Sequence, residues 1–358
     1  MKLPDSGRRK YRVALVGGAG TWGSKYLAAY AAHPDCQVVA LVDTAAQRRA
    51  DFARHYDIAQ HCDHIDVLFA RQVPDIVSAI VPVAANPAIV SACARAGVRV
   101  VSCEKPLAVS LDQADTMLAD CQRAGTVLSC GSVYSGVPYL SQTLEWMQSG
   151  ALGSVTSAAI PGGLPDEAAG GGCVQLTLLR LLTGLDAVWA QGWSGPPRPD
   201  WTWTPGTAEA DKDGPAWGRL GLAGGVECSI AEPGQAASCI VAVEGENGRL
   251  ELTSQGPVLV QNGATVRPGF AARPWASDYF SLRIERLVRA FDTGVDELDS
   301  GRGYHHALEI ALALKLSARQ GHRRVDLPLA DRSMQAVPYR YRMEGGDIAG
   351  FLGVPPTV

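Results

Sequence analysis

The sequence predicts an α/β protein in which a doubly wound parallel sheet is followed by an α/β domain with a mainly antiparallel open sheet. From Tyr11 to about Gly131, short apolar runs alternate with segments of helix-forming composition, which is typical of βαβ units. After Gly150-Ala151-Leu152-Gly153, strand-like segments of alternating polarity are separated by glycine, proline and asparagine, which indicates antiparallel strands. We therefore expect two domains, residues 1–132 and 133–358.

Each apolar run of the first domain is expected to be a buried parallel strand. The runs end near Val16, Val42, Val83, Cys103 and Cys130. Ligands of doubly wound sheets bind beyond the carboxyl ends of the strands. The residues that follow these positions are therefore the candidate site residues.

The second domain is expected to contain strands at Ser154–Ile160, Val188–Gly192, Gly218–Ala223, Val226–Ile230, Ser238–Val243 and Arg249–Thr253. Helical spacing of apolar residues predicts helices at Val174–Leu182, Asp278–Thr293 and Tyr304–Gln320, the last with Gly321 as its C-cap. Ser194–Trp217 is rich in Pro, Trp and Asp and is expected to be a long loop near the site or at a subunit contact. A C-terminal helix could return to the first domain.

Composition excludes several classes of protein. The 358 residues carry a net charge of −4 and show no basic block, so we expect no nucleic-acid partner. No apolar stretch is long enough to span a membrane, so we expect no membrane association. The nine cysteines form no C-x-x-C pair, so we expect reduced thiols in a cytoplasmic protein and no metal site.

The first apolar run breaks into a glycine-rich turn. Gly18, Gly20 and Gly23 fit the G-x-G-x-x-G spacing, and Asp43 follows the next strand twenty residues after Gly23. This arrangement predicts a dinucleotide site in which the acid accepts hydrogen bonds from the adenosine ribose. A carboxylate there would repel a 2′-phosphate, so NAD is favoured over NADP, although Arg48 and Arg49 lie close enough in sequence to weaken that preference.

A second motif follows another strand. Val98–Cys103 ends in Glu104-Lys105-Pro106, which places a lysine at the same edge of the sheet as the glycine turn. An ammonium there can polarise a carbonyl or stabilise an alkoxide, and a nearby positively charged cofactor can lower its pKa.

These motifs, together with Gly150-x-Leu152-Gly153, Val243–Gly248 and Leu327-Pro328-Leu329, resemble the Gfo/Idh/MocA family of NAD(P)-dependent oxidoreductases. The resemblance implies a Rossmann domain, a C-terminal sheet that supports dimers or tetramers, and sugar or cyclitol substrates. It assigns Lys105 to the active site as a catalytic and substrate-binding residue. The cofactor residues that it and the glycine turn indicate are Gly18, Gly20, Thr21, Trp22, Gly23, Asp43, Pro82, Asn86, Glu104 and Lys105.

The chain departs from the family pattern in its acid/base residues. Family members usually carry an Asp and a His at the start of a helix in the second domain, where this chain has Gly170–Thr177 with neither residue. Asn86 also stands where a histidine is common. Hydride transfer at a carbinol needs a proton acceptor within hydrogen-bond reach. The remaining candidates are Lys105, Tyr134, Gln175, Tyr304 and His305: Tyr134 and Gln175 as substrate-binding residues, and Tyr304 and His305 as catalytic ones.

Three functional hypotheses follow, in order of preference. The first is an NAD-dependent oxidoreductase that transfers a hydride between the nicotinamide and a secondary hydroxyl or carbonyl of a sugar, glycoside or cyclitol. The second is a redox-neutral enzyme that recycles bound NAD during elimination, glycoside cleavage or epimerisation. The third is a non-catalytic NAD-binding sensor or assembly partner, which the missing Asp/His pair supports.

Overall fold

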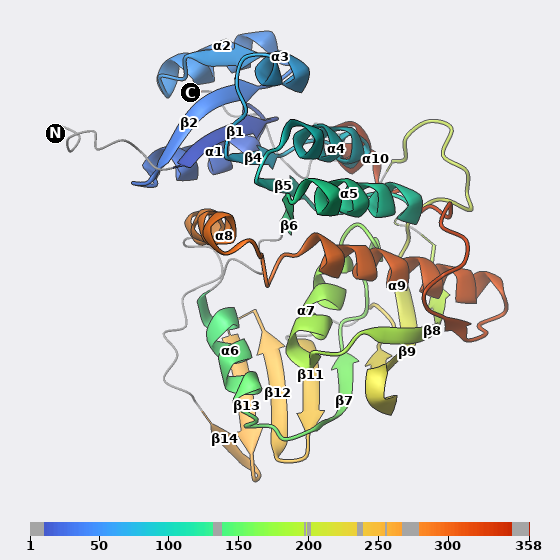
Figure 1. The fold of residues 1–358 in the computed structure, drawn as a ribbon. Coiled ribbons are helices and arrows are strands. Elements are labelled where there is room, and N and C mark those ends of the chain that lie inside the picture. The colour runs from blue at the N-terminus through green and yellow to red at the C-terminus, as the bar shows by residue number, and fades with distance from the viewer. Residues whose placement is uncertain are drawn as a thin grey trace.

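The computed structural model describes residues 11–131, 138–196, 198, 202–234, 239–254, 256–266, 279–345 and 358. It contains two sheets, and the predicted fold class is confirmed (Figure 1).

The first sheet has six parallel strands in the order β3-β2-β1-β4-β5-β6. Their bounds are Tyr11–Val16 (β1), Cys36–Val42 (β2), Gln60–Cys62 (β3), Ile76–Ala79 (β4), Val100–Glu104 (β5) and Val127–Gly131 (β6). The strand order reverses between β1 and β4, which is where a ligand of such a sheet binds. The helices between the strands are Gly23–Ala32 (α1), Ala46–His55 (α2), Ile65–Phe69 (α3), Asn86–Ala96 (α4) and Leu111–Ala124 (α5).

One predicted strand end differs. The run that was expected to end near Val83 ends as β4 at Ala79, and Val83–Ala85 form a short 3₁₀ turn (η1). Pro82 stands before this turn and has no N–H to continue a strand ladder. Pro82 therefore lies in the loop at the sheet edge, beyond the end of β4, where a cofactor-binding residue was expected.

The second sheet has nine strands in the order β14-β13-β12-β11-β7-β10-β9-β8-β15. Their bounds are Val155–Ile160 (β7), Ala187–Ser194 (β8), Ala216–Leu222 (β9), Glu227–Ile230 (β10), Cys239–Gly245 (β11), Gly248–Thr253 (β12), Gly256–Gln261 (β13), Ala264–Val266 (β14) and Val325–Asp326 (β15). All pairs are antiparallel except β7 with β10. The sheet is therefore mainly antiparallel, as predicted.

The second half of the chain adds further helices. They are Pro138–Gln148 (α6), Cys173–Thr183 (α7), Tyr279–Thr293 (α8), Gly301–Arg319 (α9) and Arg340–Glu344 (α10); a 3₁₀ turn, Ala223–Gly225 (η3), joins β9 to β10. Helix α9 lies between the sheets, against α5 and β6 on one side and α7 and β8 on the other (Figure 1). Helix α8 packs on α1, β5 and β6, so a helix from the C-terminal part of the chain completes the first domain.

Two further properties concern the described residues. No helix among them is both long and apolar enough to cross a membrane. All nine cysteines lie in the described ranges and none forms a disulfide.

Candidate functional site

The glycine turn follows β1, and each glycine of the motif has a spatial reason. A Cβ on Gly23 would stand 2.1 Å from the Gly17 oxygen, so this position must lack a side chain for α1 to pack against the strand. A Cβ on Gly18 would stand 2.6 Å from Leu41 Cδ1. A Cβ on Gly20 would meet only the Gly17 oxygen, at 3.4 Å, so this glycine faces open space. That is the position at which a pyrophosphate approaches the backbone.

Asp43 lies at the carboxyl end of β2 beside this turn. Its Oδ2 accepts a hydrogen bond from Ala19 N at 3.0 Å, and its Oδ1 accepts one from Ala45 N at 2.9 Å. The carboxylate therefore joins the glycine turn to the start of α2, and each oxygen keeps lone pairs for ribose hydroxyls. The Arg49 guanidinium donates to the Asp43 carbonyl, which brings a cation to the same place.

Thr21 and Trp22 occupy the rest of the turn. The Thr21 carbonyl accepts a hydrogen bond from Ser24 Oγ at 3.1 Å, inside the turn itself. Trp22 makes an edge contact with Phe280 of α8, with ring centroids 5.6 Å apart, and Lys25 Nζ lies 4.8 Å from its ring centroid. The indole thus packs between the turn and α8, and its contact with a cofactor stays a prediction.

Lys105 follows β5 directly and its bond to Pro106 is cis. Its Nζ donates to the Gly170 carbonyl at 3.2 Å, which connects the first domain to the loop before α7. Burial lowers the pKa of Lys105, and the nearby Arg342 guanidinium lowers it further, while Cys173, Glu167 and Glu104 oppose the change. A lysine with a lowered pKa at this edge suits proton transfer.

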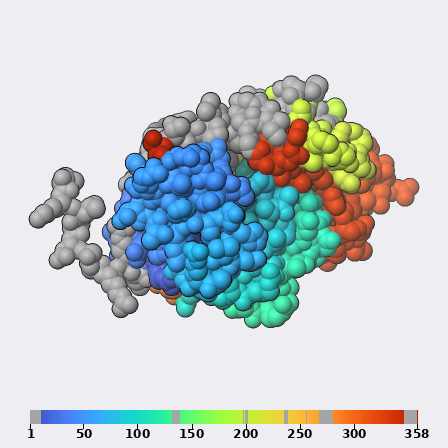
Figure 2. Space-filling model, turned by 90° about the horizontal axis from the view of Figure 1, so that it is seen from above, coloured from blue at the N-terminus to red at the C-terminus, as the bar shows by residue number. Residues whose placement is uncertain are grey.

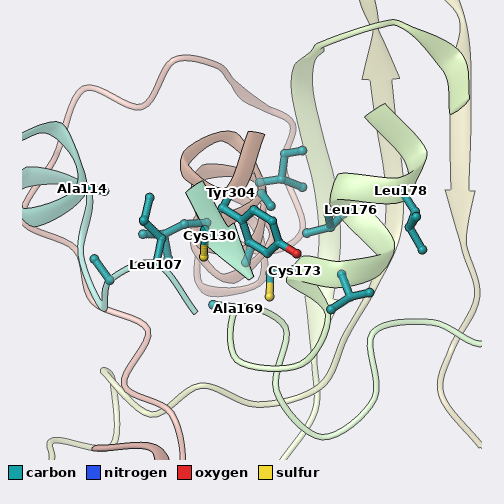
Figure 3. Packing of buried hydrophobic residues seen from close by; sticks show 14 of the residues in the cluster. Leu107, Ala114, Cys130, Ala169, Cys173, Leu176, Leu178 and Tyr304 are labelled. Carbon is teal, nitrogen blue, oxygen red and sulfur yellow. The ribbon is translucent and has the colours of Figure 1, made fainter. Parts of the chain in front are cut away.

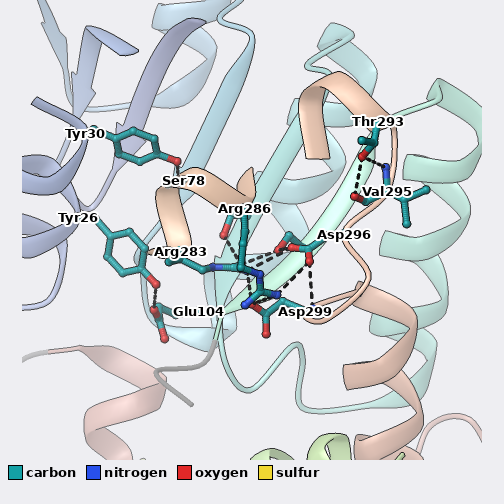
Figure 4. Close-up of polar contacts among 12 residues, drawn as sticks. Tyr26, Tyr30, Ser78, Glu104, Arg283, Arg286, Thr293, Val295, Asp296 and Asp299 are labelled. Atoms are coloured by element: carbon teal, nitrogen blue, oxygen red, sulfur yellow. Dashed lines mark hydrogen bonds and ion pairs between the residues drawn. The ribbon is translucent and has the colours of Figure 1, made fainter. Parts of the chain in front are cut away.

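Glu104 and Asn86 fix the backbone around Lys105. Glu104 Oε1 accepts a hydrogen bond from Tyr26 Oη of α1 at 2.6 Å (Figure 4), and burial raises the pKa of Glu104. Asn86 Nδ2 donates to the carbonyls of Glu104, Pro106 and Leu107 at 3.0, 3.2 and 3.3 Å. Asn86 is fully buried, so it acts on Lys105 through the backbone, and direct cofactor contact by Asn86 stays a prediction.

The loop before α7 is held in place by Asp213. Asp213 Oδ2 accepts hydrogen bonds from Ala169 N at 2.9 Å and Gly170 N at 2.7 Å. Burial raises the pKa of Asp213 to about 7, and the neighbouring Glu167 carboxylate adds to the rise. Asp213 could not be identified from the sequence, because it lies more than forty positions from the loop that it holds.

Glu167 and Arg342 were also missed. Glu167 is almost fully buried; its Oε2 accepts from Arg342 Nε and its Oε1 from Tyr339 N, both at 2.7 Å. Arg342 lies on α10, which packs against the η1 turn beside Pro82. The separation of 175 positions between Glu167 and Arg342 leaves no signal in the sequence.

The predicted acid/base candidates lie in different surroundings. Tyr304 is buried between β6 and the start of α7, with its ring among Cys130, Cys173 and Ala169 (Figure 3). Gln175 lies in the first turn of α7 and is partly exposed. Tyr304 and Gln175 therefore lie near the segment Gly170–Cys173, whose first residue accepts the hydrogen bond from Lys105. Tyr134 lies outside the described residues.

His305 is engaged elsewhere. Its Nε2 lies 2.7 Å from Asp115 Oδ1 on α5 and 3.0 Å from Arg332 Nη2. The structure thus places His305 in a charged cluster between α5 and α9, and a catalytic role for it stays a prediction.

Residues 11–132 match the sequence model of the Gfo/Idh/MocA family, an oxidoreductase family with an NAD-binding Rossmann fold. This part of the chain is therefore similar to the NAD-binding domain of that family. Within it, the open Gly20 position and the Asp43 carboxylate fit a dinucleotide, so Gly18, Gly20, Gly23 and Asp43 are the residues that would hold NAD.

Known proteins resemble more of the chain. A D-apiose dehydrogenase of Paraburkholderia graminis is 27% identical over 147 residues, 41% of this chain and 38% of that protein, so the chain spans well under half of this curated relative. An aldose-aldose oxidoreductase of Caulobacter crescentus, in complex with glycerol, superposes with a TM-score of 0.70 at 23% identity, covering 89% of this chain and 100% of that one. An oxidoreductase of Agrobacterium radiobacter, in complex with NAD+, L-tartaric acid and magnesium, superposes with a TM-score of 0.68 at 19% identity. The match covers 88% of this chain and 98% of that one. The two structural likenesses show that the fold extends over both domains.

Proposed function

We propose that the chain is an NAD-dependent oxidoreductase acting on a secondary hydroxyl or carbonyl of a sugar, glycoside or cyclitol. The observation that carries the proposal is the position of Lys105, which follows β5 at the sheet edge that bears the glycine turn and Asp43. The family match and the sugar-dehydrogenase relative support it. When bound, the nicotinamide supplies or accepts the hydride.

The chain's own residues would handle the proton. Lys105 donates one hydrogen bond to Gly170 and retains two further N–H positions for the substrate oxygen. Burial lowers the pKa of Lys105, which makes proton exchange with the substrate oxygen easier. The amine would take the hydroxyl proton during oxidation, and the ammonium would return it during reduction. Asn86, Glu104 and the Gly170 carbonyl keep the ammonium in place, which limits the reorganisation needed in the reaction.

A redox-neutral reaction is the second candidate, because Gly170–Thr177 carries neither the Asp nor the His that family members usually have there. Such a reaction would oxidise the substrate, allow elimination or epimerisation at the acidified neighbouring carbon, and reduce the intermediate again with the same cofactor.

The experiment that tests these proposals is absorbance at 340 nm with a panel of sugars, glycosides, cyclitols and pairs of aldoses, with and without added NAD. Products are analysed in parallel by mass spectrometry. Accumulation of NADH with one substrate class is the expected result. Product without NADH would favour the redox-neutral reaction. Absence of both, with NAD binding demonstrated and the panel extended to sugar acids, would favour the non-catalytic sensor.

A further inference from the structure

Two cations with open hydrogen-bond donors lie at the proposed site. Lys105 Nζ has one partner among the described residues, the Gly170 carbonyl. Arg342 uses Nε for Glu167, and its two terminal nitrogens have no hydrogen-bond partner in the part of the chain that the structure describes. The Arg342 side chain is 17% exposed, so its outer edge can be reached by a ligand. Two ammonium protons and four guanidinium N–H groups therefore remain.

The carboxylates around these cations already have donors. Glu167 accepts from Arg342 Nε and from Tyr339 N. Asp213 accepts from Ala169 N and Gly170 N, and Glu104 accepts from Tyr26 Oη. Among the residues that the structure describes, the hydrogen-bond donors left for a ligand are therefore those of Lys105 Nζ and the terminal nitrogens of Arg342.

A short chain of contacts connects the two cations. A Cβ on Gly170 would stand 2.8 Å from Glu167 Oε2, the oxygen that pairs with Arg342, and the Gly170 carbonyl accepts from Lys105. Arg342 and Lys105 therefore flank the same loop residue. The Arg342 guanidinium also lowers the pKa of Lys105, so the two cations lie near each other.

The fold holds Arg342 at the sheet edge. A Cβ on Gly345, at the end of α10, would stand 3.1 Å from Pro82 Cγ. The preceding residues are tied to the long loop by Arg340 N to Thr202 O at 3.0 Å and Asp213 N to Val337 O at 2.8 Å. Seen from above, C-terminal residues in red lie between the blue first domain and the yellow-green loop (Figure 2).

We propose that Arg342 binds a carboxylate of the substrate, so that the substrate is an acidic sugar or polyol, such as an aldonic or uronic acid, with its reacting carbon at Lys105. This inference rests on the proposed function and narrows its substrate class. A carboxylate matches the planar donor fork of a guanidinium with two parallel hydrogen bonds, which a neutral hydroxyl cannot do.

The test compares matched pairs of acidic and neutral substrates, such as a uronic acid and its parent aldose, in the wild type and two variants. Arg342→Gln removes the guanidinium group and its two parallel hydrogen-bond donors. Arg340→Gln is the control, because Arg340 lies on the same helix with an exposed side chain paired to Glu344 at 2.7 Å. We expect the wild type to prefer the acid in kcat/KM, and Arg342→Gln to reduce kcat/KM for the acid by about tenfold to a hundredfold. Arg340→Gln should leave kcat/KM for both substrates nearly unchanged. Arg342→Gln should lower kcat/KM for the neutral substrate by a smaller factor than for the acid, because Arg342 also lowers the pKa of Lys105.

Binding of the acid to the protein–NADH complex, measured by calorimetry, separates this inference from the proposed function. Loss of acid binding in Arg342→Gln, with NADH affinity and melting temperature kept, supports the inference even if no hydride transfer occurs. Two results would overturn the inference: equal kcat/KM of the wild type for neutral and acidic substrates, or normal binding of the acid by Arg342→Gln. Neither result would contradict the proposed oxidoreductase activity. A preference for a sugar phosphate over the matched carboxylate would also overturn it.

Discussion

Asp43 contributes to the proposed site through two backbone hydrogen bonds and its remaining lone pairs. Replacing Asp43 with Ala removes the acceptor for the ribose hydroxyls and the bonds from Ala19 N and Ala45 N. We expect the Kd for NAD to rise about tenfold or more, because hydrogen bonds to charged groups contribute about 1.5–3 kcal/mol. Titration calorimetry with NAD and NADP measures the change.

The selectivity of the Asp43→Ala variant between NAD and NADP distinguishes a direct cofactor contact from a structural role. The Kd for NADP should rise less than that for NAD, or fall, because the carboxylate that repels a 2′-phosphate is gone while Arg49 remains. An equal loss for both cofactors would show that Asp43 only supports the turn.

Residues of the site that belong to local motifs could be predicted from the sequence, and those that meet across the chain could not. The glycine turn, Asp43 and Lys105 each follow a strand directly, so their common edge follows from the parallel sheet. Glu167, Asp213 and Arg342 reach the site through contacts between distant segments. Their side chains carry no spacing that distinguishes them from surface charges.

Helix α8 is held to the first domain by Arg283. This fully buried side chain pairs with Asp299 and, at 3.2 Å, with Asp296, and it donates to Ser102 Oγ at 3.0 Å (Figure 4). Replacing Arg283 with Met leaves two buried carboxylates without their central partner. We expect a loss of about 3–5 kcal/mol in the free energy of unfolding, measured by urea denaturation.

The exposed Arg289 on the same helix provides the control for this prediction. Arg289→Met should change the free energy of unfolding by less than about 0.5 kcal/mol. A similar small change in Arg283→Met would show that hydrophobic packing, and not the buried ion pairs, holds α8.

The loop before α7 depends on Asp213, whose pKa is raised to about 7 by burial and by Glu167. The folded protein binds the Asp213 proton more tightly than the unfolded chain does. The resulting contribution to the free energy of unfolding is full below about pH 4 and is lost as the pH rises to about 7. Asp213→Asn keeps an oxygen for Ala169 N and Gly170 N but does not titrate.

We therefore expect the wild type to lose about 2 kcal/mol more than Asp213→Asn in the free energy of unfolding between pH 5 and pH 8. Urea denaturation at both pH values measures the difference. Parallel losses in the two proteins would show that Asp213 is ionised throughout this range.

Most longer elements could be predicted because their apolar periodicity is strong. The prediction of a helix at Asp278–Thr293 agrees with α8, and that at Tyr304–Gln320 agrees with α9 within three residues. Strands β3, β13, β14 and β15 and helix α6 were missed. Strands β3, β14 and β15 have two or three residues, and β15 extends the sheet through a segment more than a hundred residues from β8, so local pattern gives no indication of them.

At the level of the whole chain, C-terminal elements return to the first domain. Helix α8 packs on its sheet, α9 lies between the two sheets, and α10 brings Arg342 to the sheet edge. Strand β6 ends at Gly131, and α8 and α9 also contact the first sheet. The division into residues 1–132 and 133–358 stays a prediction. Assembly through the second sheet and a cytoplasmic location stay predictions.

The central claim is that Lys105 moves the proton in an NAD-dependent reaction, and Lys105→Ala tests it most directly. NAD affinity should stay nearly unchanged, because the turn and Asp43 are intact, while turnover falls by at least about a hundredfold. The measurement is NAD binding by calorimetry alongside turnover at saturating NAD, followed by mass spectrometry and absorbance at 340 nm with the best substrate of the panel. Loss of turnover with retained NAD binding is the predicted result. Near-normal turnover in Lys105→Ala would contradict the account and place the chemistry elsewhere.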